Sequence, residues 1–173
     1  PHTVSGPSLE FFTEELNTFR KSLGRFAQEG IADSDLIKAI DLYNENRDKA
    51  KALYDLRKSD PPLISGTEMS KILTAGMSLP VTESNELFAE VLEELTQKKE
   101  PTVHKAPRIM VDGACIDNID FVKLIEDSGA NVVVDSLCIG TRDYLPHTDV
   151  GGDPLDALAR RYLDKINCPR TYR

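Results

Sequence analysis

Two short runs of β-branched residues, separated by a segment with helical character, constrain this chain more than any other feature. Residues 108–112 read Arg-Ile-Met-Val-Asp and residues 131–135 read Asn-Val-Val-Val-Asp. Such continuous apolar runs are typical of strands that are covered on both faces, as in parallel sheets. With a helix expected over residues 117–128, the runs predict a parallel strand–helix–strand unit with a right-handed crossover.

The residues before this unit have helical rather than strand periodicity. In the first helix, apolar side chains follow each other at spacings of three and four, which places them on one face. We expect that whole face to be buried. Its members are Leu9, Phe12, Leu16, Phe19, Leu23 and Phe26.

A second helical stripe contains a cation. The helix is expected to begin at Asp33 or Ser34 and to end near Lys58. A buried guanidinium needs a partner, so we expect Arg47 to act as a structural clamp together with Asn44 on an adjoining face. The stripe consists of Leu36, Ile40, Tyr43, Arg47, Ala50 and Tyr54.

Three further helices are expected from capping signals. Ser65 and Glu68 have the spacing of a capping box, Thr82 or Ser84 can cap a helix that buries Leu87 or Phe88, and Asp153 can cap a last helix. The inner face of the last helix should contain Leu155, Leu158, Ala159 and Tyr162. The predicted fold is α/β, with a helical region over residues 1–100 and a partial parallel, flavodoxin- or Rossmann-like α/β domain over residues 101–173.

Charge and hydropathy exclude two classes of partner. The net charge is −8 and there is no basic run, so binding to the phosphates of a nucleic acid is not expected. No segment has the roughly 20 apolar residues that cross a bilayer, and no secretion signal is visible. We therefore expect a cytoplasmic protein that binds neither nucleic acid nor membrane.

The loops after the two strands are the candidate site, because ligands of open parallel sheets bind beyond the carboxyl ends of the strands. Arg142 can hold a carboxylate or phosphate through both arms of its guanidinium, although an ion pair with Asp135 or Asp143 would also explain it. Gly113, Cys138 and Gly140 are small enough to let a substrate approach. Asp135 is expected to accept hydrogen bonds from loop amides.

The cysteines and histidines give weaker signals. Cys115, Cys138 and Cys168 follow no metal-binding spacing, so no metal site is predicted and reduced thiols are expected. For Cys115 and Cys138 we favour buried structural positions over a role in the site. His104 and His147 are expected to be solvated loop residues.

Several segments together resemble the 2-hydroxyacyl-CoA dehydratase and benzoyl-CoA reductase family, which includes the D-component of 2-hydroxyglutaryl-CoA dehydratase. They are residues 36–47 with their Tyr-Asn-Glu-Asn-Arg end, the Pro-Pro-Leu-Ile-Ser-Gly-Thr-Glu of residues 61–68, residues 108–113, the Cys-x-Gly-x-Arg loop of residues 138–142 with the strand before it, and residues 159–169 with their Cys168-Pro169 pair.

The resemblance implies an oxygen-sensitive enzyme of anaerobic metabolism. In this family two related subunits each carry a cysteine-bound 4Fe-4S cluster, and an ATP-hydrolysing activator protein supplies electrons of low potential. The substrate is an acyl-CoA, which undergoes either dehydration (a lyase reaction) or reduction of an aromatic ring (an oxidoreductase reaction). The segments that hold the cluster in the family are missing here, so no cluster is expected in this chain.

We therefore expect the chain to be the middle portion of one subunit, contributing to the acyl-CoA cleft and inactive on its own. Its start at Pro1 without an initiator methionine agrees with a fragment. Two other interpretations remain open: a non-catalytic interaction module, and a flavodoxin-like domain that binds a small ligand.

Overall fold

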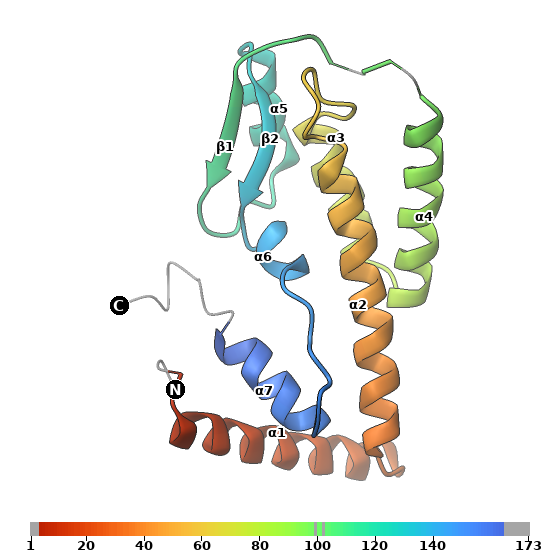
Figure 1. Cartoon of the computed structure of the whole chain (residues 1–173), viewed down its shortest axis with the longest axis vertical. Coiled ribbons are helices and arrows are strands. Elements are labelled where there is room, and N and C mark those ends of the chain that lie inside the picture. Colours follow the sequence, from red (N-terminus) through yellow and green to blue (C-terminus); the bar gives the residue numbers. More distant parts are fainter. Residues whose placement is uncertain (1–3, 99, 102, 165–173) are drawn as a thin grey trace. The chain divides into compact units, whose positions relative to one another are not determined.

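The computed structural model describes residues 4–98, 100–101 and 103–164, and its helices and strands follow the predicted order (Figure 1). A helical first half precedes a parallel strand–helix–strand unit, which confirms the predicted fold class. None of the described helices is long and apolar enough to cross a membrane. The elements are α1 (Gly6–Ala27), α2 (Asp33–Asp55), α3 (Gly66–Met77), α4 (Val81–Gln97), β1 (Arg108–Asp112), α5 (Ile119–Asp127), β2 (Asn131–Ser136), α6 (Thr141–Tyr144) and α7 (Pro154–Asp164).

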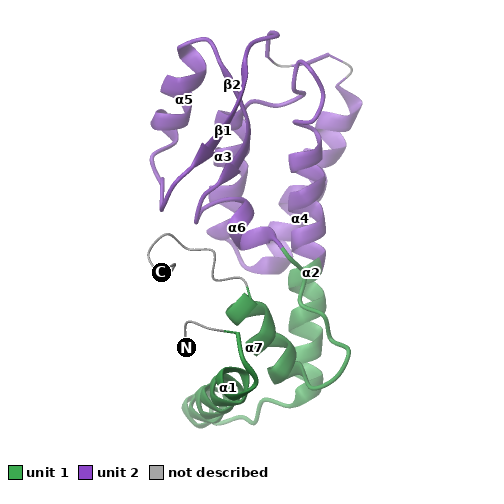
Figure 2. Cartoon of the chain, turned by 60° about the vertical axis from the view of Figure 1, so that its left-hand side comes forward, with its two compact units in different colours: residues 1–44, 146–173 green, residues 45–145 purple. Residues whose placement is uncertain are grey.

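The chain forms two compact units, which Figure 2 shows in different colours. One consists of residues 1–44 and 146–173, and the other of residues 45–145. The first unit therefore combines α1 and the first part of α2 with α7. The boundary expected between residues 100 and 101 stays a prediction, although the strands do begin shortly after it.

The helical core of the unit 45–145 forms between the second half of α2, α3 and α4. The capping box at Ser65 and Glu68 is present as predicted and starts α3. The predicted cap of α4 is wrong, because α4 begins directly after Pro80 and Ser84 is buried, where its hydroxyl accepts a hydrogen bond from Asn46 Nδ2 at 3.0 Å. The buried core residues are Ala50, Leu53, Ile64, Met69, Leu73, Phe88, Leu95 and Tyr144.

The two strands pair in parallel, with one register shift. Ile109 lies opposite Val132, but Met110 lies opposite Val134, so Val133 has no partner in β1. Helices α3 and α5 pack against β2 and against each other. Val111 and Val132 are buried on this helical side, whereas the paired Met110 and Val134 are exposed.

The other unit is built on α1, which packs against α7. The prediction that the whole apolar face of α1 is buried is wrong, because Phe19, Leu23 and Phe26 are 60%, 40% and 89% exposed. Helix α7 has 11 residues and α1 has 22, so α7 is too short to cover the full length of α1.

The buried faces of α2 and α7 each differ from the predicted ones at single residues. Tyr43 of α2 is exposed while its stripe neighbour Ile40 is buried. In α7, Asp153 caps the helix as predicted by accepting from the backbone N–H of Leu155 at 2.9 Å. However, Tyr162 is exposed and Arg161 is buried instead, since its guanidinium donates to the carbonyl of Pro146.

Candidate functional site

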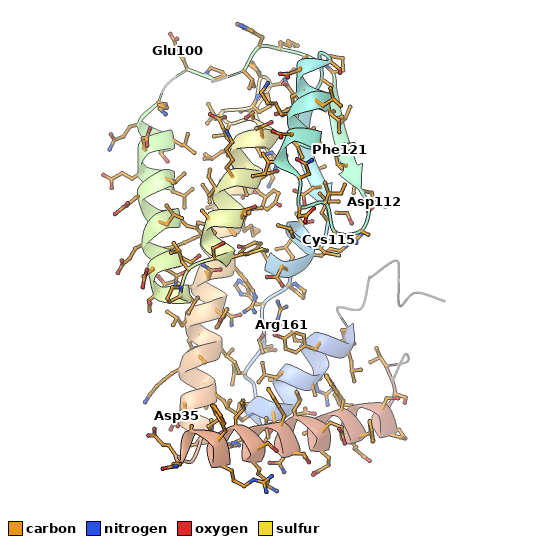
Figure 3. All side chains as sticks on the ribbon, turned by 180° about the vertical axis from the view of Figure 1, so that it is seen from behind. Asp35, Glu100, Asp112, Cys115, Phe121 and Arg161 are labelled. Atoms are coloured by element: carbon orange, nitrogen blue, oxygen red, sulfur yellow. The ribbon has the colours of Figure 1, made fainter. Side chains whose placement is uncertain are left out.

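The loops that follow β1 and β2 adjoin each other at the carboxyl edge of the sheet. The N–H of Gly113 donates to the carbonyl of Ser136 at 3.4 Å, and the N–H of Cys138 donates to the carbonyl of Ala114 at 3.5 Å. Figure 3 shows Asp112 and Cys115 at this end of the unit. Parallel pairing therefore brings the predicted site residues Gly113, Cys138, Gly140 and Arg142 onto neighbouring segments.

Arg142 of α6 fastens these two loops together. Its Nη1 donates to the carbonyl of Gly113 at 2.7 Å, and its Nη2 donates to Asp112 Oδ1 at 2.9 Å and to Ser136 Oγ at 3.0 Å. The ion pair is therefore made with Asp112 rather than with Asp135 or Asp143. Because the guanidinium side chain keeps 17% of its surface exposed, it lies at the boundary between protein and solvent.

The side chain of Asp135 holds the second loop in place. It lies on the face of β2 opposite to the one on which Ser136 contacts Arg142. Its Oδ1 accepts from the N–H of Thr141 at 3.0 Å, which confirms that it binds a loop amide. Its Oδ2 accepts from the hydroxyl of Tyr54 at 2.7 Å and lies 3.8 Å from Nη1 of Arg57. The carboxylate thus connects the loop to two side chains of the α2 region.

Burial and nearby charge shift the pKa values of Tyr54 and Arg57, the two side chains beside Asp135. Burial raises the pKa of Tyr54 well above its ordinary value, and the negative charge of Asp135 raises it further. Burial also lowers the pKa of the Arg57 guanidinium, an effect that the charge of Asp135 opposes. Tyr54 therefore keeps its proton at neutral pH and donates it in the hydrogen bond to the carboxylate.

The two glycines of the candidate site differ in their need for a small residue. A Cβ at Gly140 would lie 2.0 Å from Asp135 Oδ1, so any side chain would displace the carboxylate. A Cβ at Gly113 would meet its nearest neighbours, Ile116 and Leu137, at 3.7 Å, an ordinary contact distance. Close approach of the backbone to Asp135 explains Gly140, whereas the structure gives no steric reason for Gly113.

The thiols of Cys115 and Cys138 are both exposed, so the prediction of buried structural cysteines is wrong. Both cysteines lie in the loops that follow the strands. The helices that cover one face of the sheet do not cover these loop thiols. Cys168 lies outside the described residues. Within the described part of the chain, no three His, Cys, Asp or Glu side chains are grouped so that they could hold a metal ion.

A carboxylate that the sequence did not single out holds the start of α3. Glu126 of α5 accepts hydrogen bonds from the N–H groups of Gly66 at 2.7 Å and of Thr67 at 3.0 Å. It also accepts from the hydroxyl of Thr67 at 2.6 Å and, more weakly, from the N–H of Val132 at 3.3 Å. The negative charge at the positive end of a helix stabilises this junction of α3, α5 and β2.

The two residues expected to act as a clamp lie in different units. Asn44 exchanges two hydrogen bonds of 2.9 Å with the backbone of Thr148, accepting from its N–H and donating to its carbonyl. Arg47 is buried, as the predicted stripe requires. His104 and His147 are exposed in loops, as expected.

Comparison with known proteins gives matches over most of the chain. The sequence profile of the family described as "2-hydroxyglutaryl-CoA dehydratase, D-component" matches residues 1–173. One of the subunits of benzoyl-CoA reductase from Thauera aromatica is 29% identical over 155 residues, which cover 88% of this chain and 40% of that protein. The β subunit of (R)-phenyllactyl-CoA dehydratase from Clostridium sporogenes is 23% identical over 163 residues, covering 94% and 43% respectively. The chain thus spans less than half the length of these relatives.

Proposed function

Because this chain belongs to the 2-hydroxyglutaryl-CoA dehydratase D-component family, we propose that it is part of one subunit of an acyl-CoA dehydratase or benzoyl-CoA reductase. The two relatives named above are subunits of one enzyme of each kind, and both kinds are named for a CoA thioester substrate. Dehydration and ring reduction are therefore both retained as candidate reactions. A related second subunit, an ATP-hydrolysing activator and a cytoplasmic location belong to the same proposal.

The strand-end loops form part of the acyl-CoA cleft in this proposal. The observation that carries it is the convergence of Gly113, Cys138, Gly140 and Arg142 at the carboxyl edge of a parallel sheet, the edge at which such sheets bind ligands. Arg142 fixes both loops through Gly113 and Asp112, and its partly exposed guanidinium is available to an anionic or carbonyl oxygen of the substrate.

The described residues do not fit the 4Fe-4S cluster that the family implies. Such a cluster is held by several convergent cysteine thiolates, and the described thiols are Cys115 and Cys138 alone. We propose that the ligands lie in other parts of the subunit, and we derive no step through the cluster. Anaerobic reconstitution of this chain with iron and sulfide should leave it colourless. A stoichiometric cluster absorbance that disappears in Cys138→Ala would contradict the proposal.

The cleft is tested in the complete enzyme. The full subunit would be produced with its second subunit and activator, and assayed without oxygen with ATP on a 2-hydroxyacyl-CoA and on benzoyl-CoA. Arg142→Ala and Arg142→Lys should both lower turnover at unchanged iron content. The ammonium group of lysine cannot make the paired, planar hydrogen bonds of a guanidinium. Arg160→Ala is the control, since Arg160 forms an exposed pair with Asp156 in α7.

The two variants of Arg142 distinguish a role in substrate binding from a role in holding the strand-end loops together. If Arg142 only ties the loops together, Arg142→Lys should keep most of its activity, and Arg142→Ala should lose thermal stability in parallel with activity. A fully active Arg142→Ala enzyme of normal stability would remove this loop from the cleft.

A further inference from the structure

A small cavity lies directly beneath the two strand-end loops. Its volume is about 20 Å³, and its walls come from α3, α5, both strands and residues 116–118, 137 and 139 of the loops. Its walls also include the guanidinium-bearing Arg57, the carboxylate-bearing Asp135 and the hydroxyl-bearing Ser70, so it is not a purely apolar void.

Arg57, one of the residues that line this cavity, has buried donor groups without an acceptor in the described part of the chain. The residue is 1% exposed, and its Nη2 donates to the carbonyl of Val132. Among the described residues, its Nε and Nη1 have no hydrogen-bond acceptor. Leaving buried N–H groups of a charged side chain without an acceptor is costly, so an acceptor is expected within reach.

Asp135 is too far away to be that acceptor directly. Its Oδ2 lies 3.8 Å from Nη1 of Arg57, beyond hydrogen-bond length, and already accepts from Tyr54. A carboxylate oxygen has room for a second hydrogen bond. A water molecule can mediate a polar contact longer than about 3.5 Å.

We infer that the cavity binds one water molecule, which accepts from Nη1 of Arg57 and donates to Oδ2 of Asp135. The volume holds one water but excludes phosphate or sulfate. The carboxylate disfavours a small anion, and the guanidinium disfavours a cation. A neutral molecule that both donates and accepts hydrogen bonds can pair with the guanidinium and with the carboxylate.

This water would complete the support of the second strand-end loop. Asp135 would then hold four partners: the N–H of Thr141, the hydroxyl of Tyr54, the charge of Arg57 and the water. The water site belongs to the interior of the unit 45–145, and its occupancy does not depend on which reaction the enzyme catalyses.

A crystal structure of the chain at about 1.5 Å resolution, alone or within its full subunit, tests the site. The expected result is one density peak within hydrogen-bond distance of Arg57 Nη1 and Asp135 Oδ2. A direct hydrogen bond between these two groups with no peak, or density for a larger anion, would overturn the inference.

A filling variant provides a second test in solution. Val122 is 4% exposed and lines the cavity, so Val122→Ile should displace the water and lower the thermal midpoint. Val133→Ile is the matched control, because Val133 is partly buried and does not line the cavity. A dry cavity would accept the extra methylene, and an unchanged or raised midpoint for Val122→Ile would therefore contradict the inference.

Discussion

The hydroxyl of Tyr54 donates a hydrogen bond of 2.7 Å to Oδ2 of Asp135, joining residues that are 81 positions apart in the sequence. The bond links the end of α2 to the strand end from which the candidate site continues. A side chain of the helical half thus supports a loop of the α/β half within one compact unit.

Removing this hydroxyl should destabilise the protein measurably. Tyr54→Phe removes one of the hydrogen bonds that the Asp135 carboxylate accepts, so we expect the free energy of unfolding to fall by about 1.5–3 kcal/mol at pH 7. Urea unfolding measures the change. Tyr162→Phe is the control, since Tyr162 is exposed. Equal stabilities for Tyr54→Phe and wild type would mean that the bond does not form in solution.

The same residue predicts a pH dependence. Because the pKa of Tyr54 is raised in the folded state, its stabilising contribution is complete below the unfolded value of about 10 and is lost as the pH rises above it. The difference in unfolding free energy between wild type and Tyr54→Phe should therefore shrink by about 1.4 kcal/mol per pH unit above pH 10. A constant difference from pH 8 to 11 would disprove the shift.

Gly140 and Gly113 should respond differently to the same substitution. Gly140→Ala forces the new methyl against Asp135 Oδ1 and should cost about 1–3 kcal/mol of unfolding free energy, as overpacking does. Gly113→Ala has ordinary contact distances and should stay within about 0.5 kcal/mol of wild type. Chemical denaturation of both variants compares them, and equal losses would refute the steric explanation.

Removing the carboxylate of Glu126 should lower the free energy of unfolding more than removing an exposed carboxylate does. Glu126→Ala leaves the N–H groups of Gly66 and Thr67 without their acceptor, and we expect a loss of about 2 kcal/mol or more. Glu90→Ala in α4 is the control, because Glu90 is exposed. Circular dichroism during thermal unfolding gives both values. A Glu126→Ala variant as stable as Glu90→Ala would show that solvent replaces the carboxylate.

The two described thiols should react rapidly in the native protein. In a Cys168→Ser background, a thiol reagent such as 5,5′-dithiobis(2-nitrobenzoic acid) should modify two thiols per chain without denaturant, because Cys115 and Cys138 are exposed. Cys115→Ser and Cys138→Ser should each remove one. Reaction only after unfolding would support the buried positions that the sequence favoured.

Local signals in the sequence predicted local structure well. The first strand, the capping box at Ser65 and the cap at Asp153 follow from neighbouring residues, and all three are present. Burial was predicted less well. The period of α1 identifies its apolar face, but how much of that face is buried depends on the elements packed against it, and Phe26 stays exposed beside the shorter α7.

The contacts that shape the candidate site depend on distant residues. Arg57 and Glu126 follow no motif, and they gain their roles only when the fold brings β2 and α3 beside them. The sequence identified Arg142 as a candidate but not its partner Asp112, because that pairing depends on how the two strands align.

The register shift at Val133 determines which face of β2 carries the anchoring carboxylate. Val132 and Asp135 are three positions apart, yet Val132 is buried on the helical side and Asp135 contacts Tyr54, whereas Ser136 and Asp112 contact Arg142. Successive residues of a regular strand alternate between its faces, so if Val133 were paired with Met110, Asp135 would face away from the helices and Ser136 would face toward them. The unpaired residue therefore keeps the carboxylate of Asp135 and the guanidinium contacts of Arg142 on their separate sides, and the register of this strand is under tighter constraint than the identity of most of its residues.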